Sequence, residues 1–196
     1  MAIGLTVAGM VLAPGAGSGA DHPTLVAIER VARAHGVVVD RVDFPYRLAG
    51  RRHPDPPAVL GAAIRERASG LAGRHGVDTD HLVMGGRSMG GRICSEVVAG
   101  GLPAAGLVLI SYPLRPPGRP DKLRTGHLGS LAVPCLFVSG TRDAFGSPDE
   151  IRAAAARIPG AVSYEWLEGG DHSLRGRDDE VADLVMAWML RCFSAA

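Results

Sequence analysis

Short, uninterrupted apolar runs alternate with longer helical segments along the chain, and this alternation constrains the fold more than any other feature. Runs such as LVLI (107–110) and CLFV (135–138) lack the polar alternation of a half-exposed strand, which indicates strands buried on both faces. Strands that alternate with helices form parallel sheets with right-handed crossovers. We therefore predict an α/β fold: a three-layer α/β/α sandwich around a mostly parallel, six-stranded sheet.

The 196 residues fit a single domain, 1–196, that is long enough to bury a full core. In a sheet of this kind, ligands bind beyond the carboxyl ends of the strands, so functional residues should follow strands. The expected strands are Leu5–Leu12, Val37–Val42, His81–Gly85, Gly106–Ser111, Cys135–Ser139 and Val162–Leu167. The expected helices are Pro23–Ala34, Pro57–Ala72, Ser88–Ala99, Pro148–Arg157 and Asp178–Cys192.

The composition indicates which class of partner the protein binds and in which compartment it resides. A net charge of +1 with 21% charged residues predicts neither nucleic-acid nor membrane binding, so we expect a small-molecule partner. Cys94, Cys135 and Cys192 match neither a disulfide framework nor a zinc-ligand spacing, and Cys94 is expected to be a small buried hydrophobe. The apolar run Ile3–Ala13 has no basic residue before it and is too short for a membrane helix. These features predict a cytoplasmic protein.

The strongest local signal is the G-x-S-x-G pattern of Gly86, Arg87, Ser88, Met89 and Gly90, which falls between a predicted strand and a predicted helix. In a nucleophile elbow the serine sits on a sharp, strained turn, and side chains two residues to either side would collide with neighbouring backbone. The helix that follows directs its N-terminal N–H groups at the reacting carbonyl. The pattern is also compatible with a plain strand-to-helix turn, but its position favours Ser88 as a nucleophile.

Two later residues complete the order Ser, acid, His in which α/β hydrolases present their catalytic groups. Asp143 follows the CLFVSG strand and His172 follows the YEWLEG segment, so both lie at predicted strand ends. The alternatives are a turn-forming or capping role for Asp143 and a solvated loop position for His172. Asp149 is the expected cap of the helix after Pro148, and Asp171 is rejected as the acid because its side chain should diverge from that of its neighbour. Of the other histidines, His22 and His127 could approach the site.

An oxyanion hole should combine the backbone N–H of Met89 with one from the glycine-rich loop 14–19 after the first strand. Ala16 is the expected second donor, with Gly17 as the alternative, and Gly17 is also a candidate residue of the substrate pocket. The glycines let this loop turn toward a substrate oxygen without steric cost.

The same loop supports a rival interpretation, dinucleotide binding. Residues 15–20 satisfy G-x-G-x-x-A after a strand, and Asp40 or Asp43 follows where a ribose-binding acid would lie. Against it, a dinucleotide-binding helix opens within the glycine motif, whereas Pro23 with Asp21 as N-cap predicts a later helix start.

Two further features leave alternatives open. Arg87 and Arg92 flank the serine and either face solvent or, in the case of Arg87, support the site or meet an anionic group of the substrate. The segment that begins with Tyr112 and Pro113 leaves another strand end. It forms either a wall of the substrate pocket or a rigid surface loop.

The chain resembles the α/β-hydrolase superfamily and its compact dienelactone-hydrolase-like branch. The segments LAPGAGSGADHP, GGRSMGGR, SYPLRPPGRPDKLRTGHL, SGTRDAFG and GGDHS are similar to the testis-expressed and acetyltransferase-complex-subunit group within it. The resemblance implies a lidless core with the Ser, Asp and His placed as above. Pro14-Gly15 departs from the His-Gly of many hydrolase oxyanion loops, and the group includes complex subunits.

These features predict a serine hydrolase that cleaves an ester or thioester of a small acyl substrate and needs no metal or organic cofactor. The alternative from another class is a protein-binding module that keeps the hydrolase fold without turnover, with the Pro113–Arg124 loop as its contact surface.

Overall fold

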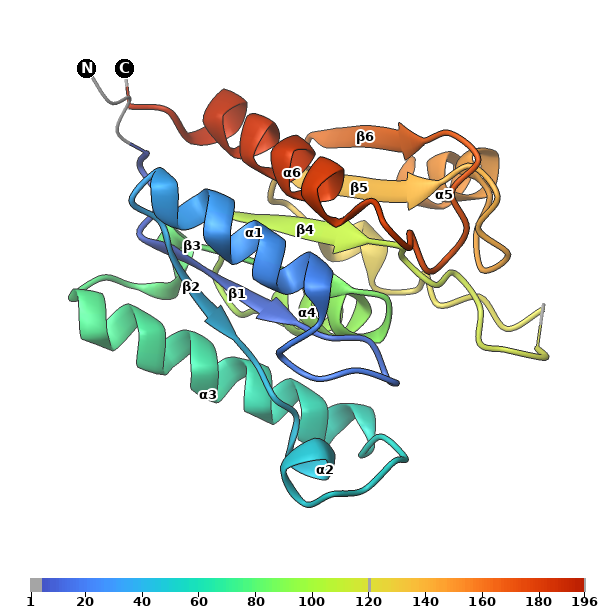
Figure 1. The fold of residues 1–196 in the computed structure, drawn as a ribbon, viewed down its shortest axis with the longest axis horizontal. Helices are drawn as coiled ribbons and strands as arrows, with labels where there is room; N and C mark the ends of the chain where they lie inside the picture. The colour runs from blue at the N-terminus through green and yellow to red at the C-terminus, as the bar shows by residue number, and fades with distance from the viewer. Residues whose placement is uncertain (1–4, 120, 196) are drawn as a thin grey trace.

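The six predicted strands form one sheet whose neighbouring strands are all parallel, in the order β2-β1-β3-β4-β5-β6 (Figure 1). The computed structural model describes residues 5–119 and 121–195. The predicted six-stranded sheet is confirmed, and within these residues it is fully rather than mostly parallel. The strands are β1 (Gly9–Ala13), β2 (Val38–Arg41), β3 (Leu82–Arg87), β4 (Gly106–Ile110), β5 (Cys135–Gly140) and β6 (Val162–Leu167).

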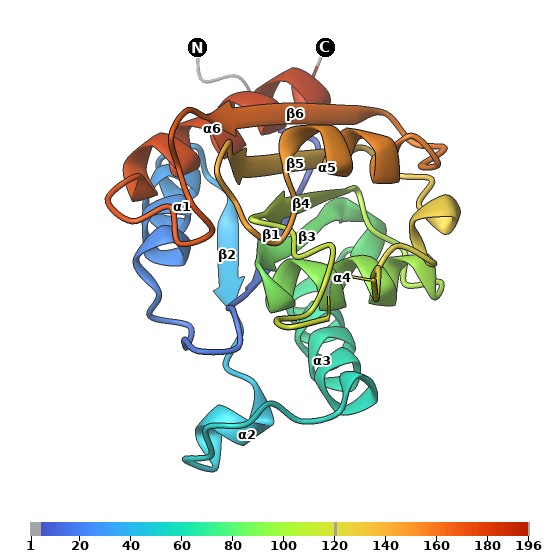
Figure 2. The same ribbon diagram turned by 90° about the vertical axis from the view of Figure 1, so that its right-hand side faces the viewer.

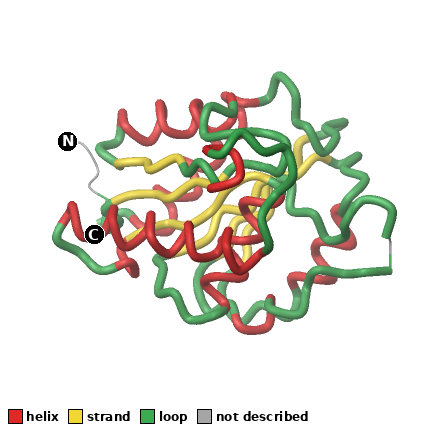
Figure 3. The backbone as a smooth tube through the Cα atoms, turned by 90° about the horizontal axis from the view of Figure 1, so that it is seen from below, coloured by secondary structure: helices red, strands yellow, loops and turns green. Residues whose placement is uncertain are grey.

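Helices cover both faces of the sheet, which gives the predicted three layers (Figure 3). Helices α1 and α6 pack together on one face, and α3 and α4 pack together on the other (Figure 1). The helices are α1 (Pro23–Ala34), α2 (Pro45–Leu48), α3 (Pro57–His75), α4 (Met89–Ala99), α5 (Pro148–Ala155) and α6 (Asp178–Phe193), with short 3-10 turns η1 (Thr79–His81) and η2 (Leu128–Ser130).

Consecutive residues of the central strands enter two separate hydrophobic cores. In β4, Leu107 and Leu109 pack with residues of α3 and α4, whereas Val108 and Ile110 pack with residues of α1 and α6. Successive side chains of a strand point to opposite faces, so a strand covered on both faces must be apolar throughout. This double burial is the physical cause of the unbroken apolar runs.

Several predicted boundaries are corrected by a few residues. The first strand begins at Gly9 because Leu5 instead forms an isolated bridge with Ser194. Helix α3 continues to His75 and ends at Gly76, whose φ of 64° is left-handed, a conformation that favours glycine at a helix end. Helix α2 lies within a segment predicted as loop. The start of the apolar run at Ile3 and residue 120 of the Pro- and Arg-rich loop lie outside the described residues.

Both predicted helix caps were wrong by one or two residues. His22, not Asp21, caps α1, and its ring nitrogen accepts a hydrogen bond from the Thr24 N–H. Ser147, not Asp149, caps α5. Its hydroxyl accepts from the N–H of Glu150, whose carboxylate accepts in return from the Ser147 N–H, a capping box that satisfies two otherwise unpaired donors.

All six strands end on one side of the molecule, to the right in Figure 1 and toward the viewer in Figure 2. The loops that follow β1, β3, β4, β5 and β6 gather there, which is the expected location of a site in a parallel sheet. Within the described residues, no helix combines the length and the apolarity needed to cross a membrane.

Candidate active site

Ser88 lies between β3 and α4 in a backbone conformation that serine rarely adopts, with φ 51° and ψ −115°. Two glycines make this turn sterically possible. A Cβ at Gly86 would lie 2.1 Å from the carbonyl oxygen of Ala13, and one at Gly90 would lie 2.2 Å from the same atom. Both distances are far below van der Waals contact, so any side chain at either position would force the neighbouring β1 end to move.

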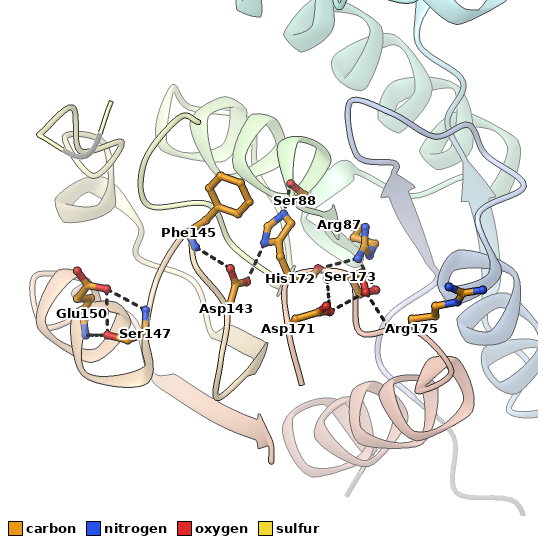
Figure 4. A network of polar contacts seen from close by, with 10 residues as sticks. All are labelled: Arg87, Ser88, Asp143, Phe145, Ser147, Glu150, Asp171, His172, Ser173 and Arg175. Carbon is orange, nitrogen blue, oxygen red and sulfur yellow. Dashed lines mark hydrogen bonds and ion pairs between the residues drawn. The ribbon is translucent and has the colours of Figure 1, made fainter. Parts of the chain in front are cut away.

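Three side chains from three strand ends form a continuous hydrogen-bonded line (Figure 4). The Ser88 Oγ lies 2.9 Å from His172 Nε2, and His172 Nδ1 lies 2.8 Å from Asp143 Oδ2. The Asp143 side chain is fully buried, while that of His172 is 23% exposed and reachable by a ligand. A buried carboxylate accepts only, so Nδ1 carries the proton and Nε2 presents its lone pair to the serine.

The loop after β5 also fixes the acid and covers the imidazole. The second Asp143 oxygen, Oδ1, accepts a hydrogen bond from the Phe145 N–H at 2.8 Å. The Phe145 ring packs edge-on against His172, with ring centroids 4.5 Å apart. Asp171 turns away and accepts from the N–H and hydroxyl of Ser173. Sequence reasoning missed Phe145, although it lies two residues after the predicted acid.

Arg87 binds the backbone of the loop that carries His172. It is 9% exposed, and its Nη2 donates to the carbonyl oxygens of His172 at 2.7 Å and Ser173 at 2.5 Å. Burial lowers the pKa of Arg87. Of the open alternatives, the solvent-facing position is therefore wrong, and the guanidinium supports the site through the backbone of the loop that carries His172.

The glycine-rich loop after β1 lies over Ser88. A Cβ at Gly15 would be 3.6 Å from the Ser88 Cβ, and the carbonyl oxygen of Ala16 accepts a hydrogen bond from the Tyr46 hydroxyl at 2.8 Å. Among the described residues, neither the Ala16 N–H nor the Met89 N–H donates a hydrogen bond, so both stay available to a ligand. The next helix begins only at Pro23, outside the glycine pattern, which is unlike a dinucleotide-binding turn.

A cavity of about 290 Å³ opens in front of the serine. Of the residues expected in the pocket, Pro113 lines it, whereas Gly17 and Tyr112 do not. Tyr112 is fully buried beneath the loop, where its hydroxyl donates to the carbonyl oxygen of Arg124. The lining shows that the segment after β4 is a pocket wall. The residues that line the whole cavity are Ala16, Pro54, Asp55, Pro57, Leu60, Ser88, Met89, Arg92, Pro113, Arg115, Pro117, Arg124, Phe145 and His172.

The other candidate groups lie outside this cavity. His127 contacts the Ser95 hydroxyl, and burial lowers the pKa of both His22 and His127. Burial raises the pKa of the Cys94 thiol to about 12, as expected for a buried structural cysteine. No cluster of three or more His, Cys, Asp or Glu side chains suited to a metal ion occurs within residues 5–119 and 121–195.

Comparison with known proteins finds a short local match to an esterase. The pimeloyl-[acyl-carrier protein] methyl ester esterase of Stenotrophomonas maltophilia is 42% identical over 57 residues, which are 29% of this chain and 22% of that relative. The chain therefore matches less than a quarter of that relative's length.

Solved structures share the fold at low sequence identity. An alpha-beta serine hydrolase homologue from Coxiella burnetii superposes with a TM-score of 0.75 at 19% identity, covering 94% of this chain and 86% of that one. A dienelactone hydrolase from Anabaena variabilis gives a TM-score of 0.74 at 18% identity, covering 97% and 89%. A family model described as an alpha/beta hydrolase domain matches residues 6–190, so the chain belongs to the α/β-hydrolase family.

Proposed function

We propose that the protein is a serine hydrolase that cleaves esters or thioesters of small acyl groups, with Ser88 as nucleophile, His172 as general base and Asp143 as the acid that orients it. The observation that carries this proposal is the Ser88–His172–Asp143 line, with contacts of 2.9 and 2.8 Å. Membership of a hydrolase family supports it, and so does local similarity to a relative named as a methyl ester esterase.

In the proposed reaction, His172 Nε2 takes the proton of the Ser88 hydroxyl as Oγ attacks the carbonyl carbon. Asp143 keeps the imidazole in the tautomer that can accept this proton and stabilises the imidazolium that forms. His172 then gives the proton to the departing alcohol or thiol. Water, activated by the same imidazole, attacks the acyl-serine and releases the acid.

The negative charge of the tetrahedral intermediate needs donors that are in place before the reaction starts. We assign this role to the N–H groups of Met89, at the first turn of α4, and Ala16. Tyr46 supports the second donor because its hydrogen bond to the Ala16 carbonyl fixes the same loop. The size of the cavity, about 290 Å³, lies at the small end for ligand pockets and favours a short acyl group.

A fluorophosphonate probe tests the proposal because it phosphonylates only a serine that a neighbouring base activates. We expect the wild type to be labelled at Ser88, with the site identified by peptide mass spectrometry. Labelling should vanish in Ser88→Ala and His172→Ala. Ser95→Ala is the matched control, since Ser95 lies on the same helix and also contacts a histidine, yet should leave labelling intact.

Two results would contradict the proposal. The first is a wild type that is folded, by circular dichroism, but stays unlabelled. This result would favour the protein-binding module, whose contact surface would be the Pro113–Arg124 loop. The second is labelling that persists in Ser88→Ala, which would move the nucleophile elsewhere.

A further inference from the structure

Three arginines from two segments line the cavity in front of Ser88: Arg92 of α4, and Arg115 and Arg124 of the loop after β4. Two of them already face a carboxylate. Arg92 Nη1 donates to Glu96 at 2.5 Å, and Arg115 pairs with Glu150. Arg124 forms no salt bridge or side-chain hydrogen bond within the part of the chain that the structure describes. The cavity therefore carries an unneutralised positive charge.

The backbone of Arg124 is fixed even though it belongs to a loop. Its N–H donates to the carbonyl oxygen of Leu114 at 2.7 Å, and its own carbonyl oxygen accepts from the buried Tyr112 hydroxyl at 2.8 Å. The guanidinium thus extends from an anchored point toward the cavity. Both contacts are made by backbone atoms, so they fix the position of the main chain from which the guanidinium extends, as preorganised binding requires.

Arg92 brings a second, more buried guanidinium to the cavity lining. It lies one helical turn after Ser88, its side chain is 11% exposed, and its Nε is buried without a hydrogen-bond partner among the described residues. Burial and then the nearby charge of Arg92 lower the pKa of Arg124, while Glu96, the partner of Arg92, opposes this shift. Two like charges at one cavity disfavour each other, and an anion between them would relieve that repulsion.

From this geometry we infer that the cavity selects esters or thioesters that carry an anionic group, a carboxylate or a phosphate, which Arg124 and Arg92 bind while Ser88 attacks the carbonyl. This inference rests on the proposed function for the chemistry at Ser88. The planar guanidinium offers paired N–H donors that match the oxygens of either anion. Asp55, the acidic residue of the lining, pairs with Arg51 at 2.7 Å and leaves the balance positive.

Two pairs of methyl and acetyl esters test the charge preference and identify the half of the substrate that carries the anion. Monomethyl glutarate against methyl pentanoate places a carboxylate on the acyl side. Acetoxypropyl phosphate against butyl acetate places a phosphate on the alcohol side. We expect at least one charged ester to exceed its neutral partner in kcat/KM by about tenfold, the effect of one or two charged hydrogen bonds.

Variants of Arg124 test whether this residue causes the preference for charged esters. Arg124→Gln should remove most of the difference in kcat/KM between charged and neutral esters. Arg124→Lys should keep part of this difference, because lysine retains the positive charge but lacks the paired N–H donors of a guanidinium. Arg119→Gln is the matched control: Arg119 is exposed, lies in the same loop and does not line the cavity, so the wild-type ratio should persist.

Binding to Ser88→Ala separates this inference from the catalytic one, since it needs no turnover. Calorimetry with glutarate and with inorganic phosphate should detect binding that Arg124→Gln weakens at least about fivefold. Hydrolysis without a charge preference would overturn the anion site and leave the hydrolase intact. Anion binding that depends on Arg124 without any ester turnover would support the anion site and contradict the proposed chemistry. If Ser88→Ala binds neither anion and no charged ester is preferred, the anion site is wrong.

Discussion

Among the described residues, two serines that lie seven positions apart each contact a histidine, one at the start of α4 and one within it. Ser88 lies 2.9 Å from His172 Nε2, and Ser95 lies 2.8 Å from His127 Nε2. Ser88 is on the strained turn at the cavity, whereas Ser95 is fully buried inside the helix. The distance between hydroxyl and imidazole is therefore not what distinguishes the two pairs.

The direction of the hydrogen bonds separates them. The Ser95 hydroxyl donates its only proton to the Arg92 carbonyl oxygen at 2.7 Å, so His127 Nε2 must donate to Ser95. His172 is the opposite case, because Asp143 holds the proton on Nδ1 and leaves Nε2 free to accept. The comparison teaches that the carboxylate, and not the proximity of a histidine, makes a serine a candidate nucleophile.

Replacing each histidine in turn gives the largest difference. His172→Ala should lower the kcat of ester hydrolysis by about 10⁶-fold, since the serine loses its base. His127→Ala should lower kcat less than tenfold and act mainly on stability, by about 1 kcal/mol, because it removes one buried hydrogen bond. Steady-state kinetics and urea unfolding measure both effects. A comparable loss of kcat in the two variants would refute the distinction.

Asp143→Asn tests whether the carboxylate sets the tautomer. The amide of the new side chain can donate to Nδ1, which favours the tautomer with its proton on Nε2, and we expect kcat to fall by about 10⁴-fold. Asp171→Asn is the matched control, because its carboxylate contacts Ser173 rather than the imidazole. It should change kcat by less than about threefold, within the small effect of an exposed residue. Equal losses would show that charge near His172, and not its tautomer, matters.

Arg87 extends the comparison to the backbone, because it donates to two carbonyl oxygens of the loop that carries His172. Arg87→Met should lower kcat by about 10- to 100-fold through misplacement of His172, with a smaller change in KM. Arg142→Met replaces an exposed arginine beside the same loop and should be close to wild type. A change in KM alone would contradict a positioning role and indicate contact with substrate.

The positions of Ser88, Asp143 and His172 could be predicted because each lies in the segment that follows the carboxyl end of a strand, and parallel strands bring these ends to one edge. The supporting contacts could not be predicted. Tyr46 reaches Ala16 from α2, a helix of four residues in a segment that local patterns indicate as loop. Such contacts depend on how distant segments pack, and no periodicity in the sequence records them.

The burial of two arginines, which the sequence left open, could not be predicted for the same reason. Arg87 and Arg92 carry charges that usually face water, yet both are only 9% exposed in the folded chain. Charged residues are rarely buried without partners, so composition alone favours exposure. Only the tertiary contacts, such as the two carbonyl oxygens that Arg87 binds, explain why these positions carry arginine.

The smallest expected effect concerns pH and the histidine of the second pair. Burial, aided by Arg92 and opposed by Glu96, lowers the pKa of His127 below its ordinary value of 6.5. Above pH 6.5 the imidazole is neutral in both the folded and the unfolded chain and contributes nothing to the difference. Below pH 6.5 the unfolded chain takes up the proton first, so the free energy of unfolding falls as pH falls, by at most about 1.4 kcal/mol per pH unit for one histidine. His22, whose pKa burial also lowers, contributes with the same sign.

Urea unfolding at pH 7.5 and 5.5 should therefore show a smaller loss of stability in His127→Gln than in the wild type. All other titrating groups are shared, so the difference isolates His127. If His127→Gln loses as much stability between pH 7.5 and 5.5 as the wild type, the imidazole is protonated as readily in the folded chain as in water. The group that donates to Ser95 would then be a charged imidazolium and not a neutral imidazole.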